Sequence, residues 1–178
     1  MLDFTIKDAS NPKYSNIIEL QVYINSGTIH YADLFLKKFS NIENAINEYG
    51  LSHMGRAVGA GIHQVIYTKI NTKQDIILLD NDDLFFNFDL GGKYENLPSC
   101  SDEDYARLLK SCFMYVIEHY SPSSLGFLVR SSSLRDGYLE KFLVSEGFLT
   151  PKHLGQNLKH KMYGKQNTFD KQLFILQN

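Results

Sequence analysis

The chain has few of the residues that mark secreted, metal-stabilised or membrane proteins. Tryptophan is absent, and the 178 residues include only two cysteines and four prolines. Cys100 and Cys112 are too few for a disulfide framework and lack the spacing of metal ligands. No run of about 18 apolar residues is present that would span a membrane, and the first residues lack the basic start and apolar centre of a secretion signal. These absences predict a cytoplasmic protein with no metal site and no membrane partner.

The composition is that of a globular protein. Hydrophobic residues make up 43% of the chain and charged residues 21%, which is too apolar for a disordered segment. No internal repeat, low-complexity tract or Pro/Ser-rich linker divides the sequence. We therefore expect residues 1–178 to form one domain with a proper core.

Charge is distributed unevenly along the chain. Nine acidic residues and one basic residue, Lys93, lie between Asp75 and Asp104, whereas Lys152 to Lys171 contains five lysines, two histidines and only Asp170 as an acid. Such polarity can steer a charged partner. Two ordinary solvated faces of a domain are the simpler interpretation, and the role of the basic segment stays open.

The first half gives a mixed pattern. Residues 16–27 fit either a strand or a helix, whereas the spacing of Leu34, Phe35 and Phe39 predicts a helix within residues 31–50, with Ser40 or Asn41 capping a second helical turn. Alternation in residues 61–70 predicts a strand.

Residues 75–92 crowd five aspartates and three phenylalanines into eighteen positions. A calcium loop fails there because Leu84 takes the fifth ligand position and Phe85 replaces the required glycine. Period-two alternation follows in "LFFNFDL", and Asn and Asp favour tight turns. The pattern predicts a hairpin with an acidic tip, so that strands near 62–70, 75–80 and 84–90 form an antiparallel meander.

The second half is clearer. Ser101 is a natural N-cap for a helix over residues 102–120, whose first turn carries three acids that complement the helix dipole. A strand over 125–131 follows, then a helix over 133–146 that Gly147 ends, and a closing hairpin of residues 157–164 and 171–177. The residues expected in the core are apolar and recur on one face of the helix or strand that holds them: Ile66, Ile77, Leu79, Phe86, Phe88, Leu109, Val116, Phe127, Val129, Leu139, Phe142 and Phe148.

Residues 108–148 resemble the second half of GNAT-type N-acetyltransferases. The stretch "LLKSCFMYVIEHYSPSSLGFLVRSSS" followed by "LEKFLVSEGF" is similar to that family's helix, strand and "EKLGF"-style helix ending. The resemblance implies an α/β (α+β) fold, with a mixed and largely antiparallel sheet on which helices pack. It also implies a divergent N-acyltransferase that uses acetyl-CoA or another acyl-CoA on a small-molecule or protein amine.

The same resemblance implies a set of site residues. Cofactor contacts would come from Phe88, Asp89 and Leu90 and from Ser131 and Ser132. Tyr138 would be the acid that protonates the departing thiolate, although the family places its tyrosine at the position of Leu143. The family binds the cofactor's pyrophosphate with a glycine-rich turn at a helix start, and here that turn reads "SDEDYA". Carboxylates there would repel phosphates.

A non-catalytic binding protein with the same fold is the alternative. Small acidic immunity, anti-defence and inhibitor proteins of bacteria and phages belong to this class, and fold analogy alone does not establish activity. An acidic surface would then bind a basic protein partner, and direct nucleic-acid binding is not expected. The residues of that surface would be Asp80, Asp82, Asp83, Asp102, Glu103 and Asp104.

Overall fold

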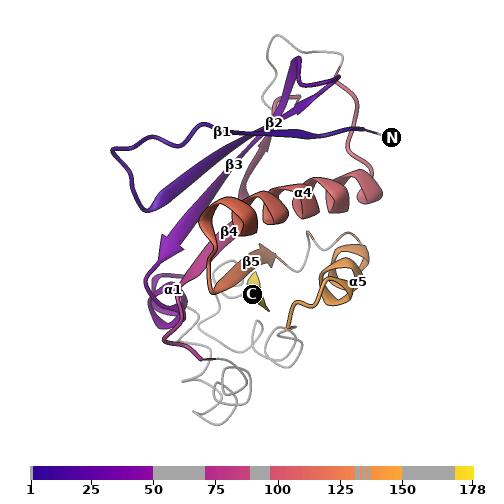
Figure 1. The fold of residues 1–178 in the computed structure, drawn as a ribbon. Helices are drawn as coiled ribbons and strands as arrows, with labels where there is room; N and C mark the ends of the chain where they lie inside the picture. Colours follow the sequence, from indigo (N-terminus) through magenta and orange to yellow (C-terminus); the bar gives the residue numbers. More distant parts are fainter. Residues whose placement is uncertain are drawn as a thin grey trace, which may run out of the picture. The chain divides into compact units, whose positions relative to one another are not determined.

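The described residues form a mixed α/β fold, in which six strands make one sheet and three helices pack on it (Figure 1). The computed structural model describes residues 2–49, 71–88, 97–130, 133, 135, 137–149 and 171–178. Neighbouring strands follow the order β1-β2-β3-β4-β5-β6. The pairs β1–β2, β2–β3 and β5–β6 are antiparallel, which agrees with the α+β class expected from the sequence.

The described residues fall into two compact units, one within Met1–Lys38 and Leu79–Pro122 and the other within Phe39–Leu78 and Ser123–Asn178. The first unit holds β1 (Thr5–Asp8), β2 (Ile17–Ile24), nearly all of β3 (Ile29–Phe39), the second part of β4 (Ile76–Phe86), and α4 (Asp102–Tyr120). The second holds α1 (Ile42–Glu48), the start of β4, β5 (Ser124–Arg130), α5 (Tyr138–Ser145) and β6 (Lys171–Gln177).

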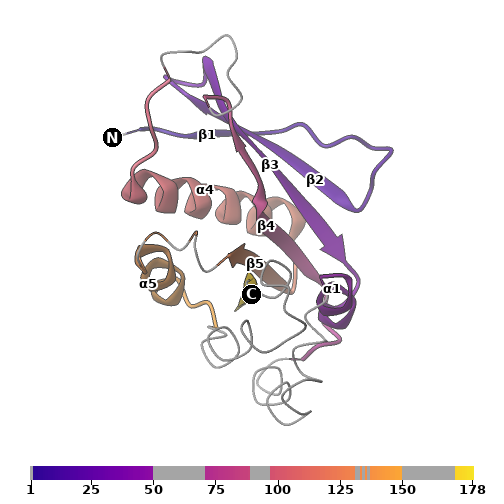
Figure 2. The ribbon, with the colours of Figure 1, turned by 180° about the vertical axis from the view of Figure 1, so that it is seen from behind.

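In the first unit, β1, β2 and β3 form an antiparallel meander, and the view from behind shows these strands together (Figure 2). Ile18, Leu20 and Val22 of β2 are buried and alternate with half-buried residues. Their partners Leu36, Leu34 and Ala32 in β3 are buried as well. This buried face of the meander packs against α4, whose own buried residues are Tyr105, Ala106, Leu108, Leu109, Cys112, Phe113 and Val116.

The helix predicted to begin at residue 31 is a strand up to Phe39, and this prediction was wrong. Leu34 and Leu36 are fully buried, whereas Asp33, Phe35 and Lys37 on the opposite face are half-buried. The period of two was hidden because Phe35 makes the outer face apolar too. The second turn-and-helix is confirmed as α1, with Asn41 as its N-cap, and residues 16–27 resolve as the strand β2.

The acidic hairpin is also contradicted. β4 runs without reversal from Ile76 to Phe86 through Asp80–Asp83, so the strands expected at 75–80 and 84–90 are one strand. The Asp82 backbone N–H donates to Asp80 Oδ1 at 3.0 Å, and two exposed side chains, Asp82 and Phe85, lie three residues apart. The Asp80 side chain thus satisfies the backbone N–H of Asp82. The alternation of buried and exposed side chains shifts by one residue here, as it does at a β-bulge, and the strand continues without a turn.

The later elements were predicted well. The helix α4 has the expected bounds and its Ser101 N-cap, and β5 and β6 lie where the sequence placed them. The helix α5 begins at Tyr138, five residues later than predicted, after Gly137 with φ 84°. It ends as expected at Gly147 (φ 95°), where the Phe148 N–H donates to the Leu143 carbonyl and the Gly147 N–H to the Val144 carbonyl, a Schellman ending.

Most of the expected core is confirmed. Ile77, Leu79, Phe86, Leu109, Val116, Phe127, Val129, Leu139 and Phe148 are buried, whereas Phe88 and Phe142 are half-buried. Ile66, the strand predicted over 62–70 and the first strand of the closing hairpin lie outside the described residues.

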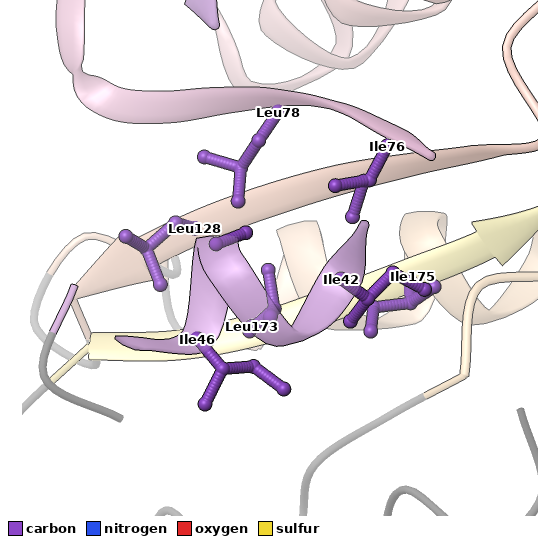
Figure 3. Packing of buried hydrophobic residues seen from close by; sticks show 8 residues of the cluster. Ile42, Ile46, Ile76, Leu78, Leu128, Leu173 and Ile175 are labelled. Carbon is purple, nitrogen blue, oxygen red and sulfur yellow. The ribbon is translucent and has the colours of Figure 1, made fainter. Parts of the chain in front are cut away.

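A core cluster of the second unit joins α1 to three strands (Figure 3). Ile42 and Ile46 of α1 pack with Leu128 of β5 and with residues of β4 and β6; the remaining members are Ala45, Ile76, Leu78, Leu173 and Ile175. Gly126 belongs to this packing, since an added Cβ would lie 2.9 Å from Ile76 Cδ1.

We predict that Leu128→Ala will lower the free energy of unfolding by about 2–5 kcal/mol, because it removes buried contacts and leaves a cavity. Urea denaturation followed by circular dichroism measures the change. Val144→Ala is the matched control, since that side chain is 46% exposed and its truncation should cost well under about 1 kcal/mol. Equal losses in the two variants would contradict this account of the core.

Candidate functional site

The start of α4 is the first candidate site. Ser101 Oγ accepts the Asp104 backbone N–H at 3.1 Å, and the Ser101 carbonyl accepts the Tyr105 N–H at 2.8 Å. Asp102 and Glu103 are exposed. The helix therefore begins with a closed serine cap and presents carboxylates outward, the opposite of the open N–H cradle that holds a phosphate.

Asp104 takes part in a polar network with the N-terminal residues. Its Oδ1 accepts from the Leu2 backbone N–H and from Arg107 Nη1, each at 3.3 Å, and its Oδ2 accepts from Ser101 Oγ at 3.0 Å. Arg107 also donates to the Leu2 carbonyl at 2.6 Å and lies over the Phe4 ring. Desolvation works to raise the pKa of Asp104, but the bonds from Ser101 and Leu2 and the charge of Arg107 outweigh it and lower the pKa.

Tyr105 fills the space between the helix start and β4. Its side chain is 4% exposed, its hydroxyl donates to Asn81 Oδ1, and its ring packs near Phe86. Phe86 in turn stacks on Phe88 and meets Tyr31 edge-on. Phe88, expected among the cofactor contacts, is thus part of an aromatic cluster. Neither Asn81 nor Tyr105 was identified from the sequence, because partners 24 residues apart leave no local pattern.

The six acids proposed as one surface occupy different environments. Asp80 is 5% exposed, Asp83 and Asp104 are half-buried, and Asp82 is exposed, as are Asp102 and Glu103. Asp80 and Asp104 take part in the bonds described above, and the exposed acids of the six are Asp82, Asp102 and Glu103.

The residues expected to carry acyl transfer are divided between the two units and the part of the chain outside the described residues. Tyr138 is the first residue of α5 and is 40% exposed. It belongs to the second unit, whereas Phe88 belongs to the first. Asp89, Leu90, Ser131 and Ser132 lie outside the described residues.

A second polar cluster lies at the other end of α4. Tyr120 donates its hydroxyl to Asp8 Oδ2, Asp8 Oδ1 accepts the Ser10 N–H at 2.9 Å, and Tyr115 also bonds Asp8. Desolvation opposes ionisation of Asp8, yet the bonds from Ser10, Tyr120 and Tyr115 lower its pKa overall. Burial first, and then the Asp8 carboxylate, raise the pKa of both tyrosines.

A third polar arrangement lies on the sheet face opposite α4. Lys7 Nζ lies 4.0 Å from the centre of the Tyr23 ring, which stacks on His30 at 5.0 Å between centroids. His30 Nε2 is 2.8 Å from Asp33 Oδ1. Sequence reasoning missed this set because it spans three strands whose register was not known.

Further features limit the chemistry of the described residues. No three His, Cys, Asp or Glu side chains among them are placed to hold a metal ion. Cys112 is completely buried, and this burial raises the pKa of its thiol. Within the same ranges, no helix is both long enough and apolar enough to cross a membrane.

Comparison with known proteins gives no family assignment: no family profile and no curated protein matches the chain.

The lowered pKa values of Asp8 and Asp104 predict acid sensitivity of the first unit. A carboxyl whose folded-state pKa is depressed stabilises the fold above its unfolded pKa of about 4, and this contribution is lost as pH falls through the lower folded value. We expect the double variant Asp8→Asn/Asp104→Asn to be less stable than wild type at pH 7 and equal to it at about pH 2. Denaturant melts across this range measure the difference.

The matched control is Glu103→Gln, which removes the charge of the neighbouring exposed carboxylate. Its stability should follow the wild-type pH curve. A constant gap between the double variant and wild type down to pH 2 would contradict the role of these two carboxylates.

Proposed function

We propose that the protein is a non-catalytic binding protein that docks on a basic partner surface through the exposed acids at the start of α4. The observation that carries the proposal is the chemistry of this start. Ser101 closes the cap, Tyr105 fills the space beside β4, and Asp102 and Glu103 present their carboxylates outward.

The same position would have to be built differently to bind an acyl-CoA. A helix start holds a pyrophosphate through available backbone N–H groups and close approach, usually over glycine. Here Tyr105 contributes a large buried side chain, and Asp104 accepts three hydrogen bonds from within the chain. Outward carboxylates favour cations, and charge complementarity mainly accelerates the encounter with a partner.

Charge reversal at the two ends of α4 tests the docking surface. Glu103→Lys and Glu118→Lys each replace an exposed glutamate on the same helix and change the net charge equally. Immobilised poly-L-lysine serves as the basic probe, and association rates are measured at low and at physiological salt. We expect Glu103→Lys to associate severalfold more slowly than Glu118→Lys and to lose most of the salt dependence.

Equal association rates in the two variants would overturn the proposed surface. Melting temperatures measured alongside show that both variants are folded, so that a slower rate is not attributed to unfolding.

A divergent acyl-CoA-dependent N-acyltransferase is the second candidate. It is favoured by the order of the described elements, in which β1, β2, β3 and α1 are followed by β4, α4, β5, α5 and β6. Tyr138 would be the acid, and acetyl-CoA the cofactor.

Thermal unfolding with increasing acetyl-CoA separates the two candidates. Docking through acids predicts no shift of the melting temperature, whereas a specific cofactor raises it with concentration by mass action. A saturable rise would support the enzyme. Tyr138→Phe should then lower kcat more than it changes the Kd of acetyl-CoA, and unchanged turnover would remove Tyr138 from the mechanism.

A further inference from the structure

The strand β1 is attached to the first unit in an unusual way. It is four residues long, lies at the end of the strand order and, among the described strands, pairs with β2 alone. None of its residues is buried; along β1 and the residues just before it, Leu2, Phe4 and Ile6 are half-buried and alternate with exposed residues. Such a stripe gives limited apolar contact, so hydrophobic burial alone holds β1 weakly.

Polar contacts at the two ends of residues 2–8, the segment that contains β1, hold it on α4. At Leu2, three residues before β1, Asp104 and Arg107 bond the backbone N–H and carbonyl. At the other end Asp8 bonds the hydroxyls of Tyr115 and Tyr120. We name these the Leu2 clamp and the Asp8 clamp. Residues 9–16 then connect β1 to β2, and most of them are exposed.

We infer that the edge of β2 and the adjoining side of α4 form a strand-acceptor edge, which β1 occupies until a partner strand replaces it. The partner is an extended peptide segment with apolar side chains at three alternate positions and a carboxylate two residues after the last of them. The chain itself shows this recognition pattern, because its own apolar and carboxylate positions are filled by Leu2, Phe4, Ile6 and Asp8.

The physical basis is strand addition to a sheet edge. Backbone hydrogen bonds supply affinity, and pockets for alternate side chains supply specificity. Here the pattern has defined receivers: Phe4 contacts Tyr31 and Arg107, Ile6 pairs with Val22 on the α4 side, and Asp8 meets the two tyrosines. The tether gives β1 a high effective concentration, so a partner strand enters only when the clamps open.

The groups that face the clamps limit how they open. Ser101 and Arg107 of α4 surround Asp104, together with the amino terminus of the chain. Tyr115, Tyr120 and Ser10 surround Asp8, with Glu118 beside Tyr115 and Lys38 over the Tyr120 ring. Because both clamps depend on a carboxylate, amide substitution weakens them with little change in shape.

The test uses the full-length chain and a fluorescent synthetic peptide of residues 2–10. Fluorescence anisotropy measures binding to wild type, to Asp8→Asn and to the control Glu103→Gln. We expect Asp8→Asn to bind the peptide about tenfold more tightly than the other two, because it weakens a charged bond of β1 and leaves the acceptor side chains Tyr120 and Asp104 in place for the peptide. A peptide with Phe4 and Ile6 replaced by serine should not bind.

Hydrogen exchange of the β1 amides completes the experiment. Faster exchange in Asp8→Asn together with peptide binding supports the inference. Faster exchange without peptide binding overturns the acceptor edge, and unchanged exchange overturns the Asp8 clamp. Should Asp8→Asn unfold, Ile6→Ser changes only β1, leaves the acceptor side chains intact and is judged by the same outcomes. Because Glu103 belongs to the proposed acidic docking surface, wild-type behaviour of Glu103→Gln shows that the peptide does not bind through that surface.

Discussion

Burial of one face of α4 against the β1–β3 meander is the interaction on which the first unit depends. Seven side chains of the helix are buried, and they meet a sheet face whose residues alternate strictly in β2. Polar contacts lie at the borders of this apolar contact. They are the exposed serine cap, the part-buried Tyr105 hydroxyl bond, the part-buried Leu2 clamp and the exposed Asp8 clamp.

The parts of the fold that could be predicted are those with one dominant local signal. A capping serine, three acids in a first turn and an apolar stripe specify α4 without help from the rest of the chain, and Gly147 specifies the end of α5 because a left-handed residue closes the helix. β3 and β4 failed for the opposite reason. Phe35 places an apolar residue on the outer face of β3, so that the sequence resembles the spacing of a helix. The Asn/Asp run in β4 is typical of a turn, but here the Asp80 side chain accepts a hydrogen bond from the backbone of the same strand.

The candidate site was less predictable than the fold because its contacts are distant in sequence. Leu2 and Asp104 are 102 residues apart, and Tyr120 reaches Asp8 across 112 residues. Composition located the acids, but only the tertiary structure shows that Asp80 is buried, that Asp104 is engaged, and that Asp82, Asp102 and Glu103 are exposed. Whether a carboxylate is available to a partner depends on such neighbours, and sequence alone does not supply them.

The start of α4 also shows how the potential of a helix dipole can be satisfied from within the chain. A helix start is positive by virtue of its dipole, and a protein can use that potential for a bound anion or satisfy it with its own acids. In this chain Ser101 and Asp104 satisfy it, and Asp104 additionally fixes the backbone of Leu2 through a bond that a bound phosphate would have to displace. The residue that closes the helix start therefore also holds the edge strand. An acid placed there stabilises the fold in two ways, and it does so by giving up the anion site that such a helix would otherwise offer.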